Sequence, residues 1–276
     1  MLKPELLLND LEQIDLSKSR YTYKGKGIPS VTELLSFVDN QGLIDWANMI
    51  GRKGINNQHV LQRAAQFGTN THSAIENYLK GKDVFTDNSS FKAFLNWWKK
   101  LNDENKVEII GQEEPLICPY FAGTYDLLIN INGDPYLVDF KTSNHIGYKY
   151  FMQIAAYRYL LYIQKNINIR GCIVLQLKKG PKPKYDDYLL RFDDPFHYEF
   201  IEMCLRAFMG IVYTFHNIES SKKQFNMIFE SKKKGWIYHP FFFDSNIILN
   251  CFLLDSMLWN VYTIPINARK HISINS

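Results

Sequence analysis

AGTYDLLININGDPYLVDFKTS, residues 122–143, consists of two apolar runs joined by Asn132-Gly133. Asn-Gly between such runs favours a two-residue hairpin turn, because both positions need a positive φ. Asp126 lies six residues before Asn132, and Asp139 lies six residues after Gly133. The sequence therefore predicts that the two carboxylates face each other across the hairpin, with Cβ atoms roughly 5 Å apart.

Lys141 adds a positive charge to this pair of acids. It follows Asp139 by two positions, so its side chain projects from the same face of the strand. Two facing carboxylates destabilise a hairpin unless a cation lies between them, and Mg²⁺ prefers one or two carboxylates with waters and phosphate oxygens. The pattern predicts metal-assisted phosphodiester hydrolysis, in which the lysine contacts the phosphate or assists the attacking water. The alternative is a surface hairpin with an Asp–Lys ion pair.

Composition limits the class of protein more than its function. The chain has 276 residues and a hydrophobic fraction of 46%, enough for one large domain or two small ones and against disorder. The net charge of +4 is too small to indicate nucleic acid by itself. Lysines cluster, however, at Lys178, Lys179, Lys182 and Lys184, and again at Lys222, Lys223 and residues 232–234. Either cluster could follow a phosphate backbone or be a solvated loop.

The cysteines and the apolar segments bear on location. The four cysteines are far apart and form no C-x-x-C pair, so we expect neither a zinc site nor an iron–sulfur cluster. Their scarcity fits a reducing compartment, and the first residues lack the layout of a signal peptide. The most apolar stretch, residues 246–266, is interrupted by polar residues. We expect a soluble, cytoplasmic protein without a membrane partner, from a bacterium or a phage-infected cell.

The order of predicted elements indicates an α/β fold. Helices are predicted near residues 30–35, 42–49, 57–80 with a weak point at Gly68, 91–101, 148–164 and 195–215. Strands are predicted at 107–118, 122–131, 135–142, 169–177 and 185–192, after an irregular lead-in over 1–28. This order predicts a mixed central sheet flanked by helices. We expect a helical region over 1–105, a core over 106–217 and a C-terminal extension of unknown role over 218–276.

Three further features are expected to surround the hairpin. His72 lies on a predicted helix and could reach a metal or a phosphate. Glu113 or Glu114 must point to the site from the strand beside the hairpin. Gln153 and Tyr157 are four apart on the helix after Lys141, so they share a face. Each of these is weak alone, and a lone histidine is more often an ordinary core or surface residue.

Together, these motifs resemble the PD-(D/E)XK nuclease superfamily, and within it the RecB-like exonuclease branch. The motifs appear in the order Gly68/His72, Glu114, Gly123/Asp126, Asp139/Lys141 and Gln153/Tyr157. The resemblance covers roughly residues 28 to 216 and is similar in layout to mitochondrial genome maintenance exonucleases and phage recombination exonucleases. It implies a restriction-endonuclease-like core with an N-terminal helical clamp over a DNA strand.

The resemblance also implies roles for individual residues. The implied catalytic residues are Asp126, Asp139, Lys141, His72 and Glu114. The implied ligands of Mg²⁺, or of Mn²⁺ in its place, are Asp126, Asp139, His72, Glu114 and the carbonyl of Phe140. The expected DNA-binding residues are Gln153, Tyr157, Lys178, Lys179, Lys182 and Lys184. Trp46, Trp97 and Trp98 could stack on bases, with packing in the core as the stronger alternative.

The function expected from these features is a metal-dependent DNA exonuclease acting on ends or single strands in replication, repair or recombination, with a possible partner protein. A structure-specific endonuclease on the same fold is the first alternative. A catalytically silent DNA-binding module is the second, and RNA as the substrate stays open.

Overall fold

The computed structural model describes residues 11–38 and 41–233. The chain divides into two compact units, Met1–Lys222 and Lys223–Ser276. Every feature discussed below belongs to the first unit, except residues 223–233 at the end of the last described helix. The apolar stretch 246–266, Cys251 and Lys234 lie outside the described residues.

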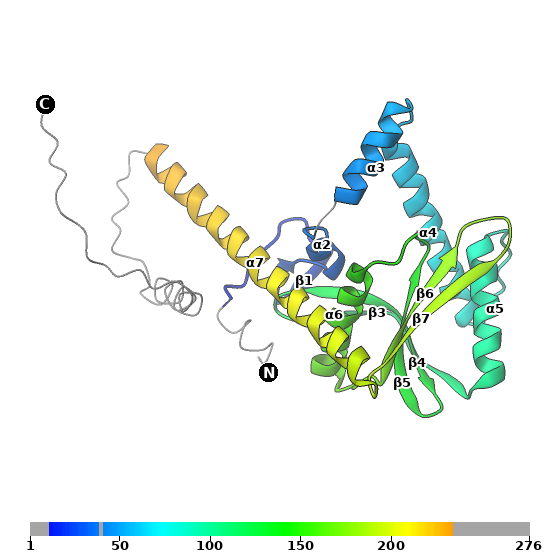
Figure 1. The fold of residues 1–276 in the computed structure, drawn as a ribbon. Helices are drawn as coiled ribbons and strands as arrows, with labels where there is room; N and C mark the ends of the chain where they lie inside the picture. Colours follow the sequence, from blue (N-terminus) through cyan, green and yellow to red (C-terminus); the bar gives the residue numbers. More distant parts are fainter. Residues whose placement is uncertain (1–10, 39–40, 234–276) are drawn as a thin grey trace, which may run out of the picture. The chain divides into compact units, whose positions relative to one another are not determined.

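A five-stranded mixed sheet forms the centre of the first unit (Figure 1). Its strands, in spatial order, are β3 (Val107–Ile117), β4 (Ala122–Ile131), β5 (Asp134–Lys141), β6 (Gly171–Lys178) and β7 (Lys184–Arg191). The first three form an antiparallel meander, β6 runs parallel to β5, and β7 runs antiparallel to β6. The parallel pair is connected through helix α6 (Tyr148–Lys165). The α/β fold with a mixed sheet flanked by helices is confirmed.

The turn between β4 and β5 has the predicted geometry. Asn132 has φ 55° and Gly133 has φ 102°, so both turn residues have the positive φ that a tight hairpin requires. The ladder pairs Ile131 with Asp134 at the turn and ends at Leu127 opposite Val138. Asp126 and Asp139 occupy the next position in this register, as the sequence predicted.

Helices cover both faces of the sheet. One face packs against α2 (Val31–Leu35), α6 and α7 (Pro195–Lys233) and buries Leu128, Leu137 and Val174. The other face packs against α4 (Asn57–Leu79) and α5 (Ser89–Glu104) and buries Leu127, Ile129, Val138 and Phe140. Successive residues of β5 thus point into different cores, as the two-residue period of a strand requires.

The segment before the sheet is more ordered than predicted. β1 (Tyr21–Tyr23) and β2 (Lys26–Ile28) form a small hairpin where an irregular lead-in was expected. Its turn is Lys24-Gly25, with φ of 49° and 80°. The capping box of α2 is confirmed, because Ser30 Oγ accepts the Glu33 N–H at 3.1 Å and Glu33 Oε2 accepts the Ser30 N–H at 3.3 Å.

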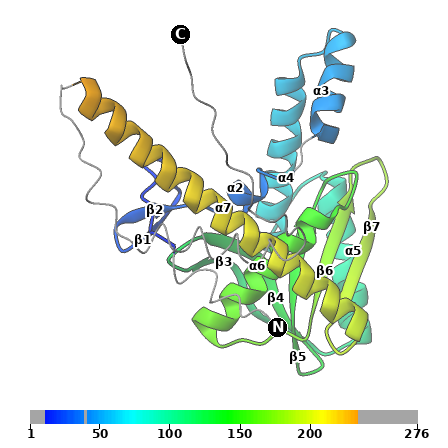
Figure 2. The ribbon, with the colours of Figure 1, turned by 60° about the vertical axis from the view of Figure 1, so that its left-hand side comes forward.

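Helix lengths differ from the predictions in two places. α4 continues through Gly68 without a break, since one helical glycine costs only about 0.5–1 kcal/mol. α7 runs to Lys233, so the predicted end near residue 215 is wrong, and the expected boundary after residue 217 lies inside this helix. α3 (Gln41–Arg52) lies beside the first part of α4, and the two helices extend away from the sheet (Figure 2). Across the described ranges, no helix has the length and apolar character to cross a membrane.

Candidate functional site

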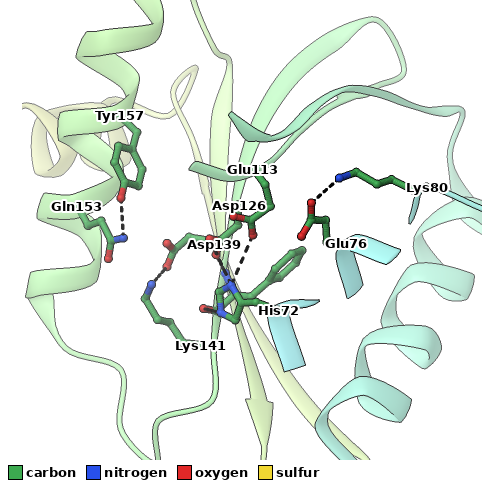
Figure 3. A network of polar contacts seen from close by, with 10 residues as sticks. His72, Glu76, Lys80, Glu113, Asp126, Asp139, Lys141, Gln153 and Tyr157 are labelled. Atoms are coloured by element: carbon green, nitrogen blue, oxygen red, sulfur yellow. Dashed lines mark hydrogen bonds and ion pairs between the residues drawn. The ribbon is translucent and has the colours of Figure 1, made fainter. Parts of the chain in front are cut away.

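His72 joins two carboxylates at the end of the hairpin (Figure 3). Its Nδ1 atom lies 3.4 Å from Asp126 Oδ1 and 3.9 Å from Glu113 Oε1. One ligand atom from each of the three residues lies within 4.8 Å of the other two, and all three side chains are half-buried. α4, β3 and β4 each contribute one residue, so the site forms only when the helix docks on the sheet.

The second nitrogen of His72 faces the backbone. Nε2 lies 3.1 Å from the carbonyl oxygen of Phe140. A histidine that donates one N–H to a carbonyl is oriented so that its other nitrogen can bind a metal or a proton. Burial disfavours protonation, but the charge and hydrogen bonding of Asp126 and Glu113 outweigh it and raise the pKa of His72 to about 10. The space between these carboxylates therefore favours a positive charge.

Asp126 is anchored at the last position of the β4–β5 ladder. Its Oδ2 accepts the Phe140 N–H at 2.6 Å, so the side chain continues the pairing after the backbone ladder ends. Burial raises the pKa of Asp126, but His72, Lys141 and this N–H outweigh burial and hold the pKa below its usual value. Asp126 is therefore ionised at neutral pH.

Asp139 lies deeper and pairs with Lys141. Its side chain is 2% exposed, and its Oδ2 lies 2.6 Å from Lys141 Nζ. This contact is an ion pair. Within the described part of the chain, neither Asp139 oxygen has a hydrogen bond of good geometry. Burial raises the pKa of Asp139 to about 6, and Lys141 offsets only part of that rise. Burial also disfavours the charge on Lys141, but Asp139 and Asp126 outweigh it, so its pKa is raised.

These residues fit a divalent cation. Asp126 and Glu113 offer carboxylate oxygens, and His72 offers a nitrogen already oriented by a backbone carbonyl. Carboxylates suit Mg²⁺ and Mn²⁺, and an imidazole is tolerated better by the transition metal. Asp139 keeps a buried oxygen without a hydrogen bond, and buried polar atoms of this kind usually have a partner. The arrangement differs from the expected pair of opposed acids, since Asp139 turns to Lys141 while Asp126 turns to His72.

A bulge in β3 decides which glutamate joins the site. The ladder pairs Ile109 with Ile129 but Gly111 with Leu128, so Ile110 is an extra residue on β3. Beyond it, Gln112 pairs with Leu127 and Glu114 pairs with Tyr125. Glu113 lies between these pairs and therefore faces Asp126. The isolated glycine inside a strand was the available sequence signal, since such glycines often mark bulges.

Glu114 is placed differently from the prediction. It accepts the Tyr125 hydroxyl at 2.9 Å and forms an ion pair with Lys165 on α6. The Lys165 contact, with the Tyr125 hydrogen bond, lowers the pKa of Glu114. Glu113, and not the expected Glu114, therefore lies beside His72 and Asp126, and the physical reason is the extra residue at Ile110.

Glu113 holds a backbone conformation that L-residues rarely adopt. Its φ of 49° lies in the left-handed region, which costs roughly 1–2 kcal/mol for a residue with a β-carbon. Strain of this kind persists where surrounding contacts impose it, and it gathers at functional sites. The hydrogen bond from Tyr125 and the ion pair with Lys165 hold the adjacent Glu114 in place and are contacts that can impose this conformation.

Gln153 and Tyr157 lie beside the acids but are not an exposed DNA-binding face. Gln153 Nε2 donates to the Tyr157 hydroxyl at 3.0 Å, and both side chains are buried (Figure 3). Burial chiefly raises the pKa of Tyr157, and the charges of Asp139 and Asp126 add to that rise. Tyr150, one turn earlier on α6, was missed by sequence reasoning. It lies three residues before Gln153 and thus on the same helical face.

The lysine loop has mixed surroundings. Lys178 forms an ion pair with Asp186 on β7, and Lys179 Nζ lies 5.1 Å from the centre of the Phe67 ring on α4. Lys182 and Lys184 are exposed. Among the tryptophans, Trp97 is buried and Trp98 packs against the same core, so packing is confirmed for both, while Trp46 is half-buried on α3.

Comparisons with known proteins do not identify a family. No family model matches the chain, and no curated protein matches it. A solved structure titled "Crystal structure of SSO0001" is 16% identical, with 67% of this chain and 79% of that chain covered and a TM-score of 0.34. A likeness this weak carries no argument, so the functional reading rests on the geometry of the site.

Proposed function

We propose that this chain is a divalent-metal-dependent DNA nuclease, and first of all an exonuclease acting on ends or single strands. The observation that carries the proposal is the meeting of His72, Glu113 and Asp126 beside the buried Asp139–Lys141 ion pair. Such a set offers both ligands for a cation and a fixed positive charge for a phosphate. A restriction-endonuclease-like core is proposed with it.

The residues supply most of the chemistry needed. A bound Mg²⁺ or Mn²⁺ would polarise a phosphate oxygen and lower the pKa of water. Glu113, Asp126, His72 and Asp139 would hold the cation, and Lys141 would offset the charge that develops on the phosphate.

Positive side chains on α3 and α4 support DNA as the substrate. Arg52 on α3, Lys53 in the turn that follows it and Arg63 on α4 are exposed. Lys179, Lys182 and Lys184 follow β6, and Lys179 lies against Phe67 of α4. We propose that these lysines and the paired helices contact the DNA backbone, with α3 and α4 acting as the clamp. A cytoplasmic location is proposed, which fits the three buried free cysteines of the described ranges.

Degradation of three substrates tests the proposal. Linear duplex, linear single strand and covalently closed circle are incubated with Mg²⁺ or Mn²⁺, beside Lys141→Ala and Asp139→Asn. An exonuclease consumes linear DNA, spares circles and is inactive in both variants. Cleavage of circles would instead favour the endonuclease on the same fold. Binding without degradation would favour a silent DNA-binding module or a need for a partner protein, and normal activity in either variant contradicts the proposed site.

A further inference from the structure

The ammonium of Lys141 has a second neighbour besides Asp139. Its Nζ atom lies 5.0 Å from the centre of the Tyr150 ring, within the range of a cation–π contact. Tyr150 belongs to the first turn of α6 and is half-buried against the core under that helix. Asp139 on β5 and Tyr150 on α6 are thus both neighbours of the ammonium.

The two contacts differ in what they depend on. Asp139 is also proposed to hold the cation, so its charge is shared once a cation binds. The ring of Tyr150 is neutral and has no part in that site, so its attraction for the ammonium persists. Lysine has a long side chain whose ordering costs up to about 2 kcal/mol of rotamer freedom. Because the Tyr150 ring stays in place, the Lys141 side chain stays ordered and does not lose this rotamer freedom again in each catalytic cycle.

The position of Tyr150 on α6 supports a common role with its neighbours. Tyr150, Gln153 and Tyr157 follow one another at spacings of three and four, so they lie on one face of the helix. Figure 3 shows Gln153 and Tyr157 directed toward the hairpin acids and Lys141. Tyr148, in the same turn, is 53% exposed.

We propose that Tyr150 is a positioning residue that holds the Lys141 ammonium beside the phosphate site. The proposal rests on the proposed nuclease function for its kinetic consequence, while the contact itself can be tested without activity. The ring, not the hydroxyl, carries the effect, because the attraction comes from the aromatic face.

Nuclear magnetic resonance of the full chain tests the contact directly. The protein is labelled with ¹³C at lysine Cε, and Lys141→Arg assigns the Lys141 signal by its loss. Ring current from Tyr150 moves the Lys141 methylene signal away from the bulk lysine position. Tyr150→Leu abolishes this displacement, while Tyr150→Phe and the control Tyr148→Leu keep it. A Lys141 signal at the bulk position in the unaltered protein overturns the contact.

Kinetics on linear DNA test the consequence. Tyr150→Leu lowers kcat about 2- to 30-fold, the range expected for one cation–π contact, and leaves KM within about 2-fold. Tyr150→Phe restores kcat, and Tyr150→Leu has no further effect in the Lys141→Ala background. Loss of rate in Tyr150→Phe equal to that in Tyr150→Leu overturns the proposal, as does an unchanged rate in Tyr150→Leu.

Two controls keep the outcomes distinct. Circular dichroism verifies folding, and Tyr150→Met replaces Tyr150→Leu if the leucine variant does not fold. If the unaltered chain degrades no DNA with either cation, the proposed nuclease function fails. The Lys141 signal then still decides whether Tyr150 holds the ammonium.

Discussion

Gly123 on β4 lies directly under the ring of Tyr157 on α6. A β-carbon built at Gly123 would be 2.5 Å from Tyr157 Cε1, closer than real contacts allow, and 3.2 Å from Val31 Cγ2, which is tighter than most contacts. The absence of a side chain at this position is therefore what lets α6 bring Tyr157 and Gln153 beside the hairpin acids.

Gly123→Ala should destabilise the protein by about 1–3 kcal/mol, because the added methyl overpacks a buried contact. Urea unfolding measures the change. Gly210→Ala is the matched control, since a β-carbon there meets nothing within 4 Å and sits in the middle of α7. It should stabilise by about 0.5–1 kcal/mol. The double variant Gly123→Ala/Tyr157→Ala should lose less stability than the sum of the losses in the two single variants, and strict additivity would argue against the close approach.

Glu113→Gln and Glu114→Gln should separate the roles of the two glutamates. Glu113→Gln removes a ligand charge, so Mn²⁺ affinity measured by calorimetry should fall about 10- to 100-fold. Glu114→Gln removes the charge that pairs with Lys165, and an exposed ion pair is worth about 1 kcal/mol or less. Stability should therefore fall slightly, with Mn²⁺ affinity within about 3-fold of the unaltered protein. The reverse pattern would restore Glu114 as the ligand.

The metal-free protein should lose stability as pH rises from about 6.5 to about 10. His72 has a folded pKa of about 10 against a usual 6.5, so its proton is bound more tightly in the folded state. This contribution is fully present below the unfolded pKa and is lost as pH rises through the folded pKa. Thermal unfolding in EDTA measures it. The His72→Gln variant lacks this group, so the difference between the two proteins should shrink over the same interval, and a constant difference would contradict the assignment.

Asp139→Asn should stabilise the metal-free protein while abolishing hydrolysis. Burial raises the pKa of Asp139 to about 6, so the ionised acid is disfavoured in the folded state. Stability carried by the protonated acid is present below the usual pKa near 4 and lost as pH rises through about 6. A neutral amide avoids that loss, and we expect a gain of about 1–2 kcal/mol at pH 7 by urea unfolding. Added Mn²⁺ should reverse the order of stability, because only the aspartate is proposed to hold the cation.

Features that depend on local sequence could be predicted. Asn132-Gly133 determined the register of the hairpin, so the strand positions of Asp126 and Asp139 were placed correctly, although their side chains turn to different partners. The capping box at Ser30 determined the start of α2 in the same way. Both follow from chemistry within a few residues along the chain, where sequence patterns are most informative.

Features that depend on packing could not be predicted. Gly111 signals a bulge in β3, but it does not show which residue leaves the ladder, because that is decided by how β3 lies against β4. The ion pair between Glu114 and Lys165 could not be predicted either, because the two residues are fifty-one positions apart in the chain. The two-residue ambiguity at Glu113 and Glu114 could thus be stated from sequence but resolved only by the three-dimensional register.

The hydrogen bond from the Phe140 amide to Asp126 makes one backbone signal a reporter of the site. An amide proton whose nitrogen lies 2.6 Å from a carboxylate oxygen resonates at an unusual position, and that position shifts when a cation draws charge from the carboxylate. Occupancy of the centre can therefore be read from a single peak in an amide spectrum. The reading requires neither DNA nor turnover, and it remains possible in Lys141→Ala, where hydrolysis is expected to be absent.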